Sequence, residues 1–408
     1  MREHRRRAPA ALIATLLTLS LGGCAIGPAY HPPAPPASAA FKEPPPEGWR
    51  QAQPNEAFPR GAWWTVFSDP QLNALEDQVS ISNQNVIAAI AQYREARDQV
   101  RIARASLFPT ITATPAVTNS KTSETFARGR VTNFVSGSIV DYNLPVDVSY
   151  QADVWGSIRR SVAAAAATAQ ASAADLENAK LTYQAQLAEM YFELHGLDAD
   201  ADLLQKTLVL YEQSLQLTQD RFSAGVVSGA DVAQAQTQLA TTRGQAIDLG
   251  VARAQYEHAI AILVGKAPSE LSIPVAVLNT PAPPIPAGLP SALMERRPDI
   301  TAMERAVAAA NQQIGIAKSA FFPVLTLSGS GGFESSSLAQ WFTWPSRFWS
   351  VGPQLAATLF EGGKRRAQVD LSEAAYDHAA ASYRQTVLTA FQQVEDELSG
   401  LRILEQEG

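Results

Sequence analysis

A proline-free run from Ser157 to Phe222 most constrains how this chain can fold. Within it, mostly apolar residues recur at alternating intervals of three and four, which is the spacing of positions a and d in a coiled coil. These positions hold Leu187, Met190, Leu194, Leu197, Ala201, Leu204, Leu208, Tyr211, Leu215, Thr218 and Phe222. At about 1.5 Å per residue, a helix over the whole run would be roughly 100 Å long, so the run predicts an elongated protein.

A second segment repeats this spacing after Gly225, and Arg253 is its one exception. Its heptad positions are Val232, Ala235, Leu239, Thr242, Ala246, Leu249, Tyr256, Ile260 and Leu263. Gly225 suits a left-handed C-cap, and Ser228 with Asp231 suits a capping box that starts the next helix. The two runs therefore predict a long antiparallel coiled-coil hairpin. Taken alone, such heptads are also typical of an ordinary coiled-coil stalk.

Strict alternation of polar and apolar residues from Asp141 to Val154 predicts an amphipathic β-strand. Shorter stretches at 110–118, 325–328 and 351–359 alternate in the same way, which gives four strands in all. A tilted strand of about 9 to 11 residues can cross a bilayer with one apolar and one polar face. Aromatic residues near the fourth strand fit an interfacial girdle, although a soluble sandwich with tryptophan in its core is the alternative. They are Trp341, Phe342, Trp344, Phe348 and Trp349.

Four strands are too few to close a membrane barrel, because the smallest barrels have about eight. An open sheet edge in lipid would leave unpaired backbone groups, each costing several kcal/mol. The barrel is therefore expected to be shared between chains. A dimer would supply eight strands, too few for a wide pore, and a trimer twelve; the strand pattern alone does not fix the number.

The chain also contains a tandem repeat. Residues 105–112 resemble 319–326, with Pro109 aligned on Pro323, and the glycine turn at Gly156 aligns with the one at Gly362. We expect a first repeat over 61–264, with strands at about 106–155, and a Pro-rich linker over 265–289. The second repeat spans 290–408, with strands at about 322–360.

The N-terminus has the pattern of a secretory signal over residues 1–23, four arginines followed by the apolar stretch Ala8–Leu21. The junction before Cys24 resembles the bacterial lipoprotein cleavage box, and Cys24 is the one cysteine of the chain. We expect Cys24 to be acylated, the alternative being a chance cysteine after an ordinary secretory cut. Ala25 fits sorting to an outer membrane. Residues 24–60 are Pro-rich and predict an extended tether without a core of its own.

Several function classes are disfavoured. A net charge of −7 argues against binding to nucleic acid. The five histidines are scattered, and no metal-spaced cluster or Gly-rich phosphate loop accompanies them, so we expect no cofactor, no metal and no enzymatic activity. Three of them, His195, His258 and His378, are expected on solvated helix faces.

At the hairpin tip, the segment from Arg221 to Val232 resembles the periplasmic tip of the outer-membrane efflux protein family, the TolC-like channels. Three further motifs resemble its NodT-type lipoprotein branch, which serves resistance-nodulation-division pumps. These motifs lie at 24–33, at 63–72, where Trp63-Trp64 precedes Asp69-Pro70, and at 105–109.

The resemblance implies a homotrimer in the outer membrane of a Gram-negative bacterium. Its mainly α fold would combine a 12-stranded transmembrane β-barrel with a periplasmic α-barrel of long helical hairpins. It would be a passive conduit for small molecules exported by an inner-membrane pump through a periplasmic adaptor protein. Cys24 would carry the lipid, and the adaptor-contacting tip would comprise Arg221, Gly225, Ser228, Asp231 and Val232.

Two alternatives remain at this point: the channel of a type I protein secretion system, and a non-conducting structural coiled-coil lipoprotein. The exported substrate and the identity of the pump are not readable from the sequence. The second repeat stops at Gly408, without a partner for residues from about 205 to 264 of the first. The family's second hairpin tip and its gate residues are therefore expected to be missing from this chain, which would be a fragment or a shortened relative.

Overall fold

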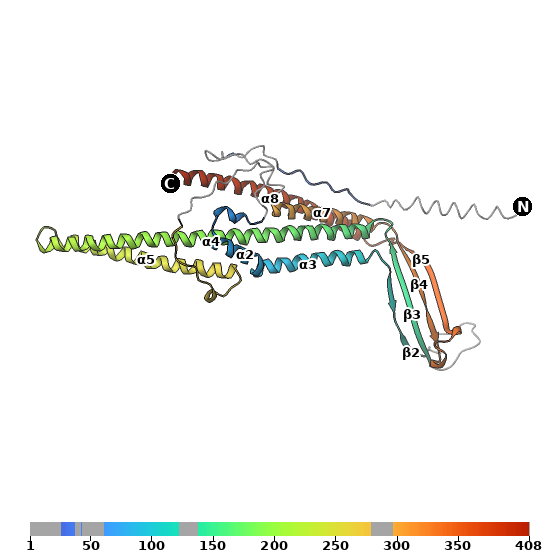
Figure 1. Ribbon diagram of the computed structural model, residues 1–408. Coiled ribbons are helices and arrows are strands. Elements are labelled where there is room, and N and C mark those ends of the chain that lie inside the picture. Colours follow the sequence, from blue (N-terminus) through green and yellow to red (C-terminus); the bar gives the residue numbers. More distant parts are fainter. Residues whose placement is uncertain (1–25, 37–41, 43–60, 122–137, 279–296, 408) are drawn as a thin grey trace. The chain divides into compact units, whose positions relative to one another are not determined.

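The computed structural model describes residues 26–36, 42, 61–121, 138–278 and 297–407 (Figure 1). They form two compact units. The first comprises the described residues within Met1–Ala34, Glu95–Ala171 and Met303–Arg384, and contains the β-sheet. The second comprises the described residues within Pro35–Arg94, Ser172–Ala302 and Gln385–Gly408, and contains the helical hairpin.

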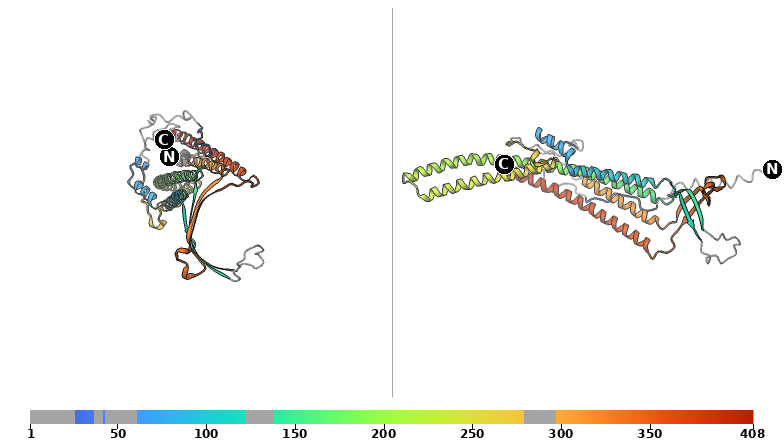
Figure 2. Two further views of the ribbon diagram at one scale, coloured as in Figure 1. Left: turned by 90° about the vertical axis from the view of Figure 1, so that its right-hand side faces the viewer. Right: turned by 90° about the horizontal axis from the view of Figure 1, so that it is seen from below.

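The predicted long helices are confirmed. Helix α4 runs over Ser157–Ser223 and α5 over Gly229–Leu263, and they lie side by side along the hairpin (Figures 1 and 2). No proline interrupts either run, so each i to i−4 hydrogen-bond ladder can continue. The other long helices are α3 (Gln84–Ala105), α7 (Pro298–Ser319) and α8 (Lys364–Glu407).

A hydrophobic core in the second unit joins the short helix α2 (Pro70–Ser82) to α4 and α5. Its buried side chains include Leu72, Leu75 and Val79 of α2, Leu187, Tyr191 and Leu194 of α4, and Ile260 and Leu263 of α5. Trp64, from the 3-10 helix η1 (Trp63–Phe67), packs into the same cluster. The heptad side chains at the base of the hairpin therefore pack against α2 as well as against each other.

Asp69 holds the start of α2 in place. Its Oδ1 accepts the backbone N–H groups of Gln71 at 2.8 Å and Leu72 at 3.1 Å, while Pro70 occupies the first helical turn. Its Oδ2 accepts the hydroxyl of Tyr191 on α4 at 2.8 Å. This N-cap thus also ties α2 to the hairpin, which explains the Asp-Pro pair that the sequence contains.

The first unit holds an antiparallel sheet of β1 (Thr110–Ala113), β2 (Ala116–Ser120), β3 (Ile139–Ala152), β4 (Val324–Ser335) and β5 (Arg347–Ala356). Its order is β1-β3-β4-β5, with β2 also paired to β3. The predicted first strand is interrupted at Pro115, which has no N–H to donate. The described sheet therefore has five strands, but β1 and β2 occupy one row, so four rows remain as predicted.

The 3-10 turns η2 (Pro268–Glu270), η3 (Leu338–Gln340) and η4 (Trp344–Ser346) complete the described elements. The last two connect β4 to β5. The sequence predicted aromatic residues near the fourth strand, but it did not predict these turns.

Candidate functional site: an amphipathic sheet and a helical hairpin tip

One face of the sheet is apolar across all four rows of strands. Val148 of β3 lies beside Ile111 of β1 and Gly329 of β4, and Gly329 lies beside Val351 of β5. Ile111 is 66% exposed and Val351 77%, so within the described chain nothing covers this face. A soluble sandwich would bury these side chains in its core, and the described residues therefore argue against that alternative.

The opposite face of the sheet is polar at the residues that neighbour these apolar ones along each strand. Asp147 of β3 lies between Thr112 of β1 and Ser330 of β4, and Ser330 lies beside Ser350 of β5. Because successive side chains on a strand point to opposite sides, the alternation in the sequence becomes two chemically distinct faces. One face is suited to lipid and the other to water.

Two glycines of β4 lie on the apolar face, next to large apolar side chains of β5. A Cβ on Gly329 would lie 3.8 Å from the Val351 side chain, and one on Gly331 would lie 3.9 Å from Cβ of Trp349. Trp349 itself is 79% exposed. A Cβ at either glycine would therefore make ordinary van der Waals contact with the apolar side chains of β5.

Of the five predicted girdle residues, Trp341 and Phe342 lie together in the β4–β5 connection, whereas the successive Phe348 and Trp349 lie on β5 and point to opposite faces of the sheet. Trp341 stacks on Phe342 at a ring distance of 4.7 Å and contacts Tyr142 of β3 at 5.6 Å. Its indole N–H donates to the carbonyl of Phe333 at 3.2 Å. Aromatic rings with an apolar body and a polar tip are typical of a membrane interface, but the role of an interfacial girdle stays a prediction.

The tip of the helical hairpin is a compact turn. Gly225 has φ +75°, its N–H donates to the carbonyl of Phe222 at 2.9 Å, and the N–H of Val226 donates to the carbonyl of Arg221 at 2.9 Å. This pair of bonds is a Schellman motif, which ends α4. The left-handed C-cap predicted at Gly225 is confirmed.

Asp231 caps the start of the return helix α5, whose first residue is Gly229 and whose N-cap is Ser228. Its carboxylate accepts the backbone N–H of Ser228 at 2.8 Å and the Ser228 hydroxyl at 2.7 Å, so the carboxylate half of the predicted capping box is formed. These hydrogen bonds hold the pKa of Asp231 below its usual value. Arg221, Gly225, Ser228 and Asp231 are exposed, and Val232 is half-buried.

Two exposed apolar residues, Phe222 and Val226, also lie at the tip. Val226 is 72% exposed, and the ring of Phe222 lies next to Gly229 at the start of α5. The heptad pattern did include Phe222, but as a core position. The described tip therefore presents two exposed apolar side chains, flanked by the positive Arg221 and the negative Asp231.

Comparison with known proteins decides the family. The model of the outer membrane efflux protein family matches residues 75–266 and 289–407. The chain belongs to the outer membrane efflux protein family. This efflux protein is 30% identical to the probable efflux pump outer membrane protein TtgC of Pseudomonas putida, over 95% of this chain and 79% of TtgC.

It is likewise 30% identical to nodulation protein T of Rhizobium leguminosarum bv. trifolii, over 94% of this chain and 80% of the relative. Among solved structures it is similar to the outer-membrane channel OprN, with a TM-score of 0.82 and 30% identity over 94% of this chain and 84% of OprN. The predictions of a TolC-like fold, of an outer-membrane channel for efflux pumps and of a non-enzymatic protein are thereby confirmed.

One prediction about the histidines of this efflux protein is wrong. His258 and His378 are exposed, but the side chain of His195 is buried. Its Nδ1 lies 2.8 Å from the carbonyl oxygen of Ala276, so Nδ1 carries the proton. His195 has a partner in a segment distant in sequence, which its own helix pattern could not reveal.

The heptad exception Arg253 belongs to the same cluster. Its Nε donates to Asp198 at 2.6 Å, and its Nη2 donates to the carbonyl of Ile273 at 2.8 Å. The other oxygen of Asp198 accepts the N–H of Ala276 at 3.1 Å. Arg253 and Asp198 therefore fasten the segment 271–278 to the hairpin, and a charged residue in an apolar heptad was the signal of that contact.

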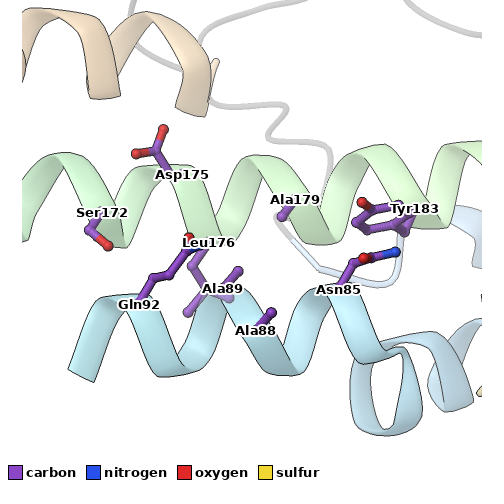
Figure 3. A pocket seen from close by; sticks show the side chains of 9 residues that line it. All are labelled: Asn85, Ala88, Ala89, Gln92, Ser172, Asp175, Leu176, Ala179 and Tyr183. Carbon is purple, nitrogen blue, oxygen red and sulfur yellow. The ribbon is translucent and has the colours of Figure 1, made fainter. Parts of the chain in front are cut away.

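A groove of about 260 Å³ runs between α3 and α4 in the second unit (Figure 3). Ala88 and Ala89 of α3 face Leu176 and Ala179 of α4, and such small residues let two helices pack closely. Asp175, whose pKa is raised by partial burial, points away from α3. We interpret the groove as a feature of helix packing.

Cys24 lies outside the described residues. Across the described part of the chain, no helix combines the length and apolarity that crossing a membrane requires. The same residues contain no group of three or more His, Cys, Asp or Glu side chains that could hold a metal ion.

Proposed function

We propose that three copies of this chain close a channel in the outer membrane of a Gram-negative bacterium. Each copy would contribute four rows of strands, and the row of β1 and β2 would pair with β5 of a neighbouring copy to give a twelve-stranded barrel. Two observations support this: the described sheet has free edges at β1–β2 and at β5, and it has one apolar and one polar face. The number three comes from the family resemblance.

The native mass of detergent-extracted protein tests the shared barrel. We expect a species of three chain masses from purified outer membranes. Val351→Lys should abolish it, because a lysine facing the middle of the bilayer costs about 2–4 kcal/mol in each copy. A monomer of the unaltered chain would contradict the proposal.

Ser350→Lys is the matched control. Ser350 is the neighbouring residue on β5, is exposed, and belongs to the polar face. The same charge added there would face the water-filled lumen, so the trimer should persist. Equal loss with both variants would mean that the two faces of the sheet do not differ as proposed.

We further propose that the channel is a passive conduit for small molecules, loaded by an inner-membrane pump through a periplasmic adaptor. Cys24, acylated after removal of residues 1–23, would anchor each copy to the membrane. The adaptor would contact the tip at Arg221, Gly225, Ser228, Asp231 and Val232. The exposed turn with its apolar surface and flanking charges supports this assignment.

Arg221→Glu should reduce efflux to the level of a deletion strain while leaving the protein in the outer membrane. Reversing one charge in a protein interface weakens binding by about 2 kcal/mol or more, which is more than tenfold. Drug accumulation in the deletion strain carrying the variant measures the effect. Lys206→Glu makes the same charge change on an exposed part of α4 away from the tip and should leave efflux intact. Normal efflux with Arg221→Glu would count against the tip as the contact.

A further inference from the structure

The chain from Ile26 to Tyr30 lies against α4 and α7 in the first unit. It has no helix or strand, as the prediction of an extended tether requires, but it is not free of the body. The groove that it occupies is lined by Gly156, which directly precedes α4, by Arg160 and Ala163 of α4, and by Gln312 of α7.

On the side of the first repeat, two contacts hold this segment. The N–H of Ile26 donates to the carbonyl of Trp155 at 3.2 Å. The guanidinium of Arg160 reaches the carbonyl of Pro28 at 3.4 Å and also donates to Gln312 of the second repeat at 2.8 Å. Arg160, a residue of the first repeat, therefore contacts both the segment and the second repeat.

On the side of the second repeat, α7 supplies the partners. The Asn311 amide reaches the same carbonyl of Pro28 at 3.4 Å. The Tyr30 hydroxyl donates to the Glu304 carboxylate and lies 3.3 Å from the Glu304 carbonyl. The segment thus bridges two helices that belong to different repeats.

Two glycines make the close approach possible. Gly27 has φ +120°, and a Cβ on it would lie 2.5 Å from the Cα of Gly315. A Cβ on Gly315 would in turn overlap the side chain of Arg160. The fit therefore requires a residue without a side chain at both positions.

We propose that Ile26–Tyr30 is a clip: an intramolecular peptide ligand whose binding site, formed by Arg160, Asn311, Gln312, Glu304 and Gly315, fastens the two repeats together. The clip binds through its backbone carbonyl and amide groups and through Tyr30. Its specificity comes from the pair of glycines, which admits this segment at a distance that no side chain would allow.

The clip also fixes where the N-terminus leaves the body, a consequence that rests on the proposed acylation of Cys24. Trp155 follows β3, donates its indole N–H to the carbonyl of Pro323 at 2.8 Å, and packs on Phe322 at a ring distance of 4.8 Å. Two residues of chain span at most about 7 Å, so a lipid on Cys24 would start within that distance of Ile26. The anchor would therefore enter the membrane beside the strand–helix junction.

Thiol cross-linking tests the clip in the full chain. Cys24→Ser removes the one natural cysteine, and Ala29→Cys with Ala163→Cys places two exposed thiols in the groove. A short bifunctional thiol reagent should join them in most molecules. Adding Gly27→Ala should lower the yield at least about fivefold, because an undocked segment loses its high effective concentration at the site.

Gly61→Ala is the control, since Gly61 has φ +146° but nothing within 4 Å of the added Cβ. It introduces comparable backbone strain without a clash and should leave the yield unchanged. A low cross-linking yield in the two-cysteine chain that still has Gly27 would overturn the proposal. An equal fall in cross-linking yield with Gly27→Ala and with Gly61→Ala would also overturn it. Because these chains lack Cys24, the result is independent of lipidation, which palmitate labelling of the unaltered chain measures separately.

Discussion

Replacing Gly265 by alanine should destabilise the protein by about 2–5 kcal/mol, whereas the same change at Gly225 should cost about 1–2 kcal/mol. Both glycines end a helix of the hairpin in a Schellman motif, and their φ angles are +73° and +75°. The backbone strain that a Cβ introduces is therefore nearly the same at the two sites.

The surroundings of the two glycines differ. Around Gly225 no atom lies within 4 Å of the added Cβ, because the tip is exposed. At Gly265 the Cβ would overlap the carbonyl oxygen of Ser82, with the Ser82 carbonyl carbon at 2.9 Å. Ser82 ends α2, whose apolar side is part of the buried core, so the backbone there has little room to move.

Denaturant unfolding of the two variants, followed by circular dichroism in one detergent, measures the difference. Gly225→Ala serves as the matched control for backbone strain. If both variants lose the same free energy of unfolding, Ser82 moves away at little cost, and the junction of α2 with α5 is looser than the contacts indicate.

Sequence periodicity predicted the regular elements well. Helix α4 begins at the predicted Ser157 and ends one residue after Phe222, because an uninterrupted heptad pattern and a glycine cap are both local signals. The strand around Asp141–Val154 was likewise found from its alternation. The break at Pro115 was missed, because a proline on the outer row of a sheet still fits the alternating pattern.

The remaining errors concern contacts between distant segments. His195 and Arg253 have partners in 271–278, and Pro28 has partners on α4 and α7. No period of 2 or 3.6 encodes such a contact. The sequence signalled one of these contacts, because Arg253 is a charged residue at an apolar heptad position. Its partner Asp198 could be identified only from the fold that brings the two side chains together.

Replacing Glu76 by glutamine should stabilise the protein at pH 8 and above but have little effect near pH 4. Glu76 lies on α2, is fully buried, and neither carboxylate oxygen has a hydrogen-bond partner in the described part of the chain. Burial, followed by the charge of Asp77, raises its pKa from 4.5 to about 8.

The sign follows from proton binding. The folded state holds the proton up to about pH 8, whereas the unfolded state releases it near pH 4.5. Stability of the unaltered protein should therefore fall as pH rises from about 4.5 to about 8, and then level off. At 1.36 kcal/mol per pKa unit the total fall is roughly 4–5 kcal/mol. Glutamine is neutral throughout and removes this decline.

Thermal unfolding of both proteins at several pH values between 4 and 9 measures the effect, and Asp77→Asn is the control. Asp77 is exposed on the same helix, so its replacement removes the same formal charge without relieving a buried carboxylate. It should recover only a small part of the decline, because water screens an exposed charge. If Glu76→Gln leaves the pH dependence unchanged, the carboxylate has found water or another partner when ionised, and burial alone does not set its proton affinity.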